Sequence, residues 1–173
     1  EFTQGITQLN ESARSSNRRL LSGASSVPGI SSAIAADLCA GMDEIFLIDT
    51  AIMPGNRAPR GASVVSSIIS QLGTSPNVYR GGVWRRKNCW SDSRQIELAP
   101  NLSRTVRFIE VPDIRLFPKF FDAKSVIFRA GLELTILNMA MILIAAIRRR
   151  WMFPVTPEFA EFFRKVANLF LPF

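Results

Sequence analysis

The segment LLSGASSVPGISSAIAADL, Leu20 to Leu38, narrows the possible folds of this chain more than any other. The apolar run at 19–22 predicts a short strand, and a turn with two glycines and a proline follows it. Apolar residues at helical spacing then predict a helix over 30–41, which Gly41 ends. Free N–H groups at such a helix start lie beside small residues, which suits either a bound ligand or a tight structural corner.

The remaining pattern alternates helices with strands early in the chain and becomes hairpin-like in the middle. We expect helices over 2–15, 61–72, 113–121, 132–150 and 157–169, strands over 44–52, 94–98, 105–111 and 125–129, and a glycine-turn hairpin over 77–86. This order predicts an α+β (mixed α/β) fold, with a mostly antiparallel or mixed sheet covered by helices.

Composition limits the chemistry open to the chain. Its 173 residues are 47% hydrophobic, enough to bury the core of one medium domain, and the net charge of +7 permits anionic partners. The sequence has no histidine, which excludes a Ser-His-Asp or Cys-His nucleophile system and a histidine zinc site within it. Cys39 and Cys89 lack metal or disulfide spacing, so we expect free thiols in a reducing compartment and no metal site.

The turn from Gly23 to Gly29 matches none of three enzyme motifs. It lacks the Gly-Lys-Ser/Thr ending of a P-loop, it lacks GxGxxG, and Val27 stands where a nucleophile elbow needs glycine. Taken by itself, the turn is therefore better explained as a structural corner than as a binding loop.

The loop GNRAPRG, Gly55 to Gly61, places Arg57 and Arg60 beside the start of the next predicted helix. Planar guanidinium groups and helix N–H groups together suit a carboxylate or a phosphate. A solvated loop whose arginines face water explains the pattern equally well.

A basic and aromatic cluster occupies the predicted hairpin and the residues after it: Tyr79, Arg80, Trp84, Arg85, Arg86, Lys87 and Trp90. Aromatic stacking combined with phosphate contacts is typical of nucleic-acid binding. A hairpin with one half-buried face yields the same composition, and no named nucleic-acid motif is present. We therefore favour the hairpin and keep a nucleic-acid module as a third interpretation of the chain.

The run LTILNMAMILIAAI over 134–147 is nearly all apolar and is followed by Arg148 to Trp151. Basic and aromatic flanks are typical of a membrane interface, but the run is shorter than the roughly 20 residues of a membrane span. We favour a core or interface helix and keep peripheral membrane contact through 132–151 as the second interpretation.

Several of these motifs together resemble the saccharopine dehydrogenase family, in its saccharopine-dehydrogenase-like oxidoreductase branch. GASSVPG is similar to the family's Pro-Gly turn and helix just after the dinucleotide-binding domain. PRG at 59–61 is similar to a helix start of the family, and YRGGVWRR to its short glycine-turn hairpin. VPDIRLFP and FRAGLEL also resemble this branch, and the resemblance extends over about 2–150.

The resemblance implies an NAD(P)-dependent oxidoreductase acting on a CH–NH bond, in which an N-terminal Rossmann domain binds most of the cofactor. This chain carries no Rossmann fingerprint. Residues 1–18 would then be a helix from the inter-domain region, and 19–173 an incomplete substrate and dimerisation domain. The implied parent is a cytoplasmic homo-oligomer, and we expect the fragment alone to be inactive.

The resemblance also implies two sets of site residues. The cofactor side, a corner facing the nicotinamide, would comprise Ser25, Ser26, Pro28 and Gly29. The side that holds a small anionic, amino-acid-like substrate would comprise Asn56, Arg57, Arg60 and Gly61. The sequence identifies no catalytic residue.

Overall fold

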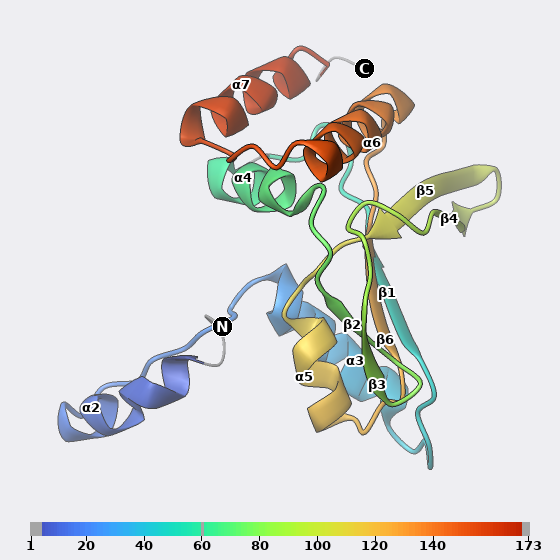
Figure 1. The fold of residues 1–173 in the computed structure, drawn as a ribbon. Helices are drawn as coiled ribbons and strands as arrows, with labels where there is room; N and C mark the ends of the chain where they lie inside the picture. The colour runs from blue at the N-terminus through green and yellow to red at the C-terminus, as the bar shows by residue number, and fades with distance from the viewer. Residues whose placement is uncertain (1–4, 60, 171–173) are drawn as a thin grey trace.

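The computed structural model describes residues 5–59 and 61–170, and it confirms the α+β class (Figure 1). The strands of the sheet are β1 (Ile48–Ile52), β2 (Asn77–Arg80), β3 (Val83–Arg86), β4 (Arg94–Ala99), β5 (Leu102–Phe108) and β6 (Val126–Ala130). The helical segments are η1 (Ile6–Leu9), α2 (Asn10–Ser15), η2 (Ser26–Ile30), α3 (Ser31–Cys39), α4 (Ala62–Gln71), α5 (Asp113–Phe120), α6 (Thr135–Arg150) and α7 (Pro157–Asn168).

Strand β6 is the centre of the sheet, and all five of its residues are buried. It pairs in parallel with β1 along its whole length, from Ile48 opposite Val126 to Ile52 opposite Ala130. On its other side it pairs antiparallel with β2 at its start and with β5 at its end. Because β2–β3 and β4–β5 are antiparallel hairpins, the sheet is mixed, with one parallel pair.

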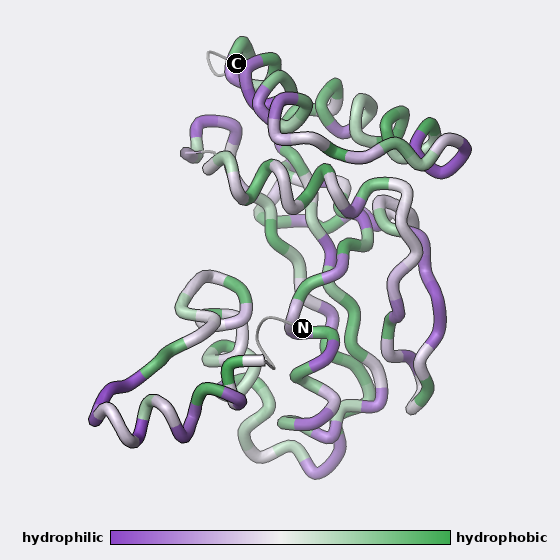
Figure 2. The backbone as a smooth tube through the Cα atoms, turned by 60° about the vertical axis from the view of Figure 1, so that its left-hand side comes forward, coloured by the Kyte–Doolittle hydropathy of each residue, from purple (hydrophilic) through white to green (hydrophobic). Residues whose placement is uncertain are grey.

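The core lies between this sheet and the helices beside it. Its most deeply buried apolar side chains come from α4, β5, α5 and β6: Ile69, Phe108, Ile114, Phe117, Val126 and Phe128. Figure 1 shows α3 and α5 alongside the strands, whereas α4, α6 and α7 gather beyond one end of the sheet. The N-terminal η1 and α2 bury no side chain and project from the rest, and Figure 2 shows that α2 is largely hydrophilic.

Helix α4 is joined to α6 through a buried arginine. Arg148 lies on the buried side of α6, and its Nη1 donates to the carbonyl oxygens of Ile69, Ser70 and Leu72 at the end of α4. A positively charged donor at a helix C-terminus satisfies carbonyl groups that have no partner within the helix.

Three strand predictions need correction. The strand predicted at 19–22 does not form, because Leu20 and Leu21 are exposed and no strand pairs with them. The strand predicted over 44–52 begins only at Ile48, since the residues before it do not pair with β6. The strand predicted over 105–111 forms instead at Leu102–Phe108, because it pairs with β4 as a hairpin that turns at Asn101, where φ is 65°.

The other elements lie within a few residues of their predictions, including α3, α4, α5, α6, α7 and the glycine-turn hairpin β2–β3. Of the helix predicted over 2–15, residues 2–4 lie outside the described residues, and η1 and α2 cover the rest.

Candidate functional site

A cavity of about 410 Å³ lies where the parallel strands β1 and β6 end. Ile52 and Ala130 are the last residues of these strands, and both line it. The 25–27 turn forms another wall, one side of α4 a third, and the segment 109–112 a fourth. Ligands in α/β proteins commonly bind beyond the carboxyl ends of parallel strands, so this cavity, here called the strand-end cleft, is the candidate site.

The turn on one side of the cleft is closed by its own glycines. Gly23 has φ of +80°, and its carbonyl oxygen accepts the Ser25 N–H at 2.8 Å. A Cβ added at Gly29 would lie 2.8 Å from that oxygen, so the turn requires glycine there. The Val27–Pro28 peptide within the turn is cis.

Only two of the four residues predicted to bind a cofactor face the strand-end cleft. Ser25 and Ser26 are exposed and line the strand-end cleft. Pro28 and Gly29 do not line it and instead pack against Gly23 within the turn. The two serines stay candidate contacts with a ligand, whereas the contribution of Pro28 and Gly29 would be the shape of the turn.

The four residues predicted to bind a substrate are also separated. Asn56 is buried: its N–H donates to Glu133 Oε2, and its side-chain Nδ2 donates to the Phe170 carbonyl. Gly61 immediately precedes α4 as its N-cap residue. Arg57 is exposed and does not line the cleft, and Arg60 lies outside the described residues.

Sequence reasoning missed the polar groups that face the cleft from α4 and from the segment after β3. Ser63, Ser67 and Gln71 line it at four-residue spacing, so they share one side of α4. Gln71 Oε1 accepts the Glu110 N–H at 2.9 Å, which ties α4 to the end of β5. This polar stripe was visible in the sequence as the face of the helix opposite its most buried residues.

Trp90 also lines the cleft, and its side chain is almost fully buried. Its indole N–H is buried and has no hydrogen-bond partner among the described residues. The cleft thus offers the hydroxyl groups of its serines on an otherwise mostly apolar surface.

No nucleophile–base pair lines the strand-end cleft in the part of the chain that the structure describes. Its one carboxylate, Glu110, accepts a hydrogen bond from Arg115 at 3.1 Å. The Cys89 thiol lies nearby, but burial raises its pKa, so it stays protonated at neutral pH. Among residues 5–59 and 61–170, no His, Cys, Asp and Glu residues cluster as metal ligands would. The lining is suited to positioning a ligand rather than to acid–base chemistry.

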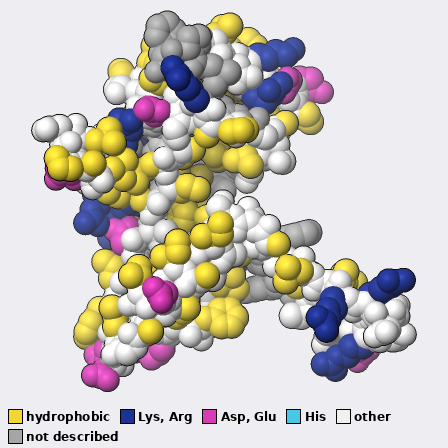
Figure 3. Space-filling view, turned by 180° about the vertical axis from the view of Figure 1, so that it is seen from behind, with side chains coloured by type: hydrophobic (Ala, Val, Ile, Leu, Met, Phe, Trp, Pro, Cys, Tyr) yellow, Lys and Arg dark blue, Asp and Glu magenta, His cyan; other side chains and the backbone are white. Residues whose placement is uncertain are grey.

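A second cavity, of about 520 Å³, lies between α3 and β1 and shares Ser26, Val27, Ile52 and Phe128 with the strand-end cleft. Its walls are mostly apolar, and several of its side chains are exposed, including Ile34 and Leu38 of α3. Figure 3 shows one face of the molecule, which is hollowed near its middle and exposes hydrophobic side chains there. The glycine turn therefore separates two apolar hollows.

Asp113, in the first turn of α5, is buried beside α3. Among the described residues, neither carboxylate oxygen has a partner in hydrogen-bonding geometry. Desolvation raises the pKa of Asp113, although the Ser31 hydroxyl and the aspartate's own backbone N–H act in the opposite direction.

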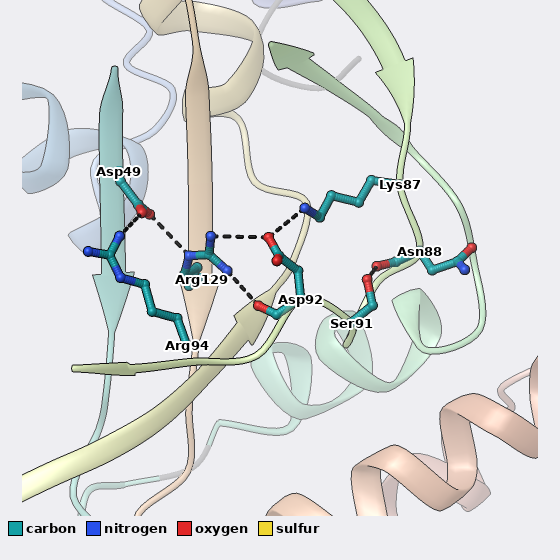
Figure 4. Close-up of polar contacts among 7 residues, drawn as sticks. All are labelled: Asp49, Lys87, Asn88, Ser91, Asp92, Arg94 and Arg129. Carbon is teal, nitrogen blue, oxygen red and sulfur yellow. Dashed lines mark hydrogen bonds and ion pairs between the residues drawn. The ribbon is translucent and has the colours of Figure 1, made fainter. Parts of the chain in front are cut away.

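An ion-pair network that the sequence did not predict holds the segment 87–94 against the sheet (Figure 4). Arg129 of β6 is buried at its centre, with Nε donating to Asp49 Oδ1 at 3.2 Å and Nη2 pairing with Asp92 Oδ2 at 3.1 Å. Lys87 pairs with the same carboxylate of Asp92, and Arg94 pairs with Asp49. The hydrogen bond from Lys87, followed by the charge of Arg129, holds the pKa of Asp92 below its ordinary value.

The residues of the basic and aromatic cluster on and after the hairpin have different surroundings in the structure. Trp90 is buried, Lys87 pairs with Asp92, and Arg86 Nε donates to the Ser75 carbonyl at 3.1 Å. Tyr79 and Trp84 pack on each other with ring centroids 5.0 Å apart. Arg80, Trp84, Arg85 and Arg86 are exposed on the hairpin, whereas the buried Trp90 is not part of that surface.

No protein-family model matches the chain, and no curated protein matches it significantly. Both cysteines are free thiols, as expected. None of the helices within the described ranges combines the length and the apolar character that crossing a bilayer requires.

Proposed function

We propose that this chain is the substrate and dimerisation domain of an NAD(P)-dependent oxidoreductase similar to saccharopine dehydrogenase, in a cytoplasmic homo-oligomer. The observation that carries the proposal is the strand-end cleft, in which the 25–27 turn and the start of α4 meet. These two segments lie about 40 residues apart in the sequence. The turn carries Ser25 and Ser26 of the cofactor side that the resemblance implies, and α4 follows directly on the loop to which the resemblance assigns the substrate.

The lining supports this function physically. Small residues at the turn let a flat ring approach the backbone closely, and the hydroxyls of Ser63 and Ser67 offer polar contacts. Because the described lining holds no nucleophile–base pair, hydride transfer would be the chemistry of the cofactor, and the chain would supply its orientation and a dry surface. Most of the NAD(P) would be held by a Rossmann domain outside these 173 residues.

The substrate in this proposal is a small anion with an amino-acid-like structure. Arg57 is its candidate contact within the described residues, because the exposed guanidinium lies in the loop that leads into α4. Arg60 is the second candidate from the same loop. An arginine of this loop would hold a carboxylate through paired N–H donors.

The test uses the parent protein and measures binding of NADPH and of NADH by calorimetry. Ser67 is exposed and lines the cleft, so Ser67→Trp would fill the cleft at little cost to folding. Ser70 is exposed on the same helix but does not line the cleft, so Ser70→Trp is the matched control.

We expect Ser67→Trp to weaken dinucleotide binding about tenfold or more, and Ser70→Trp to leave it unchanged. Equal loss in both variants, or a parent protein that binds neither dinucleotide, would refute the proposal. Sedimentation of the parent protein as a monomer would refute the homo-oligomer.

A second function is favoured by the outward face of α6. The exposed side chains of this helix are apolar from Ile136 through Met139 and Leu143 to Ile147. Arg149 and Arg150 are exposed at its end, and Trp151 follows them. An apolar helix face with basic and aromatic residues at one end suits peripheral contact with an anionic membrane.

Vesicle flotation separates this second function from the first. The wild-type chain should float with phosphatidylserine-containing vesicles, and the double variant Arg149→Glu/Arg150→Glu should float less. The double variant Arg80→Glu/Arg85→Glu, two exposed substitutions on the β2–β3 hairpin with the same charge change, is the control. Absence of flotation by the wild-type chain would exclude the membrane function and leave the oxidoreductase proposal untouched.

A further inference from the structure

A third cavity, of about 310 Å³, lies between the β4–β5 hairpin and the start of α6. Ser103, Thr105 and Arg107 alternate along β5 and line it, so they lie on one face of that strand. Leu132, Met139 and Ile142 line it from the segment before α6 and from the helix itself. The cavity therefore has a polar wall opposite an apolar wall, and it is called the hairpin cavity below.

The polar wall carries one positive charge that is not compensated. Arg104 pairs with Glu133 at 2.6 Å, and Glu133 also accepts the Asn56 N–H, so the charges of this pair are matched. Arg107 makes no hydrogen bond or ion pair with the described residues, and its buried Nε has no acceptor. A guanidinium group has five donors and no acceptor, so only an oxygen-bearing, anionic group satisfies it well.

The ligand that these walls fit has a single negative charge. The Arg104–Glu133 pair adds no net charge to the lining, so a second negative charge on the ligand would have no cationic partner there, which disfavours a phosphate or a dicarboxylate. The Asn138 amide also lies in the lining, but it is occupied by the backbone of Leu132, donating to its carbonyl at 2.7 Å and accepting its N–H at 3.3 Å. The apolar wall is left to contact a hydrocarbon part of the ligand.

We propose that the hairpin cavity binds a monocarboxylate with an apolar chain, whose carboxylate pairs with Arg107 and whose chain lies against Met139 and Ile142. The hydroxyls of Ser103 and Thr105 are positioned on the same face to donate to the carboxylate. This binding site is separate from the strand-end cleft and does not depend on the proposed oxidoreductase function.

The experiment titrates the 173-residue chain with octanoate in a calorimeter and repeats the titration with 1-octanol. Octanol has the same chain without the charge, so it isolates the contribution of the carboxylate. Arg107→Gln removes the unpaired charge, and Arg85→Gln on β3 removes an exposed charge elsewhere as the matched control. Met139→Asp, at an exposed position of the apolar wall, tests the site from the other side.

We expect saturable octanoate binding, weaker binding of octanol, and an affinity about tenfold or more lower in Arg107→Gln, as the loss of a charge-assisted hydrogen bond gives. Met139→Asp should also weaken octanoate binding, and Arg85→Gln should not. Circular dichroism checks that each variant is folded. No saturable binding to the wild-type chain, equal binding of octanol, or unchanged binding to both Arg107→Gln and Met139→Asp would overturn the proposal.

Discussion

Replacing Arg148 with methionine should destabilise the chain more than any other single charge removal on α6. The side chain is 5% exposed, and its Nη1 lies 2.7, 2.9 and 2.6 Å from the carbonyl oxygens of Ile69, Ser70 and Leu72. Methionine fills a similar volume but donates nothing, so the end of α4 would lose its charged donor.

The magnitude follows from counting donors. Nη1 carries two N–H bonds, so the three carbonyl oxygens share them and the count is about two full hydrogen bonds. A hydrogen bond to a charged group contributes about 1.5–3 kcal/mol, giving roughly 3–6 kcal/mol before desolvation of the guanidinium is subtracted. Burial lowers the pKa of Arg148, because desolvation disfavours the charged guanidinium. We expect a net loss of about 3 kcal/mol in the free energy of unfolding.

Urea unfolding followed by circular dichroism measures this loss. Arg149→Met is the matched control, because Arg149 is the next residue of the same helix and is exposed. The control should change the free energy of unfolding by less than about 0.5 kcal/mol. If both variants unfold at the same urea concentration, the arginine does not stabilise the end of α4 as argued here.

Three further predictions concern stability. Asp113→Asn should stabilise the chain at pH 7, because burial raises the pKa of Asp113 and its ionisation therefore opposes folding. This gain in the free energy of unfolding should vanish below the ordinary aspartate pKa of about 3.9, where the carboxyl is protonated in both the folded and the unfolded chain. Asp92→Asn should destabilise the chain, because Lys87 holds the pKa of Asp92 low and the ionised carboxylate therefore favours folding. This loss in the free energy of unfolding should be full above about pH 4 and should shrink as the pH falls through the lowered pKa. Gly131→Ala should cost about 1–3 kcal/mol, because the added Cβ would lie 2.5 Å from the Thr105 carbonyl oxygen.

Each of these predictions is checked by urea unfolding, repeated over a range of pH for the two aspartates. A pH-independent difference for Asp113→Asn would mean that the carboxyl titrates alike in the folded and unfolded chains. Destabilisation by Asp92→Asn that grows in acid would contradict the assigned sign. Gly55→Ala is the control for Gly131→Ala, because the nearest atom to its added Cβ is 3.7 Å away. Equal stability of the two alanine variants would refute the close contact.

The elements that sequence reasoning located best are those whose periodicity is local. Helix α4 and the hairpin β2–β3 carry their own signals, namely apolar spacing ended by Gly73 and a turn at Gly81–Gly82 where both glycines have positive φ. The strand predicted over 19–22 failed because a strand also requires a partner, and its apolar residues found none.

The candidate site was located only in part, for the same reason. The 25–27 turn was expected to face a ligand, and it lines the strand-end cleft. Of the residues expected to hold the substrate, Asn56, Arg57 and Gly61 do not line the cleft, and Arg60 lies outside the described residues. The α4 side chains that do line it were not expected there. Trp90, expected in a half-buried hairpin, came into the lining through tertiary packing.

Sequence alone determined the α+β class, the positions of the main helices to within a few residues and the glycine turn of the β2–β3 hairpin, because these depend on periodicity and on backbone angles available to few residues. Tertiary structure decided that β6 is the centre of the sheet and that Arg129 and Arg148 are buried donors while Arg107 is left unpaired. All three residues are arginines, so the sequence does not distinguish their roles. The role of each depends on which hydrogen-bond acceptors the folded chain brings within about 3 Å of its guanidinium group.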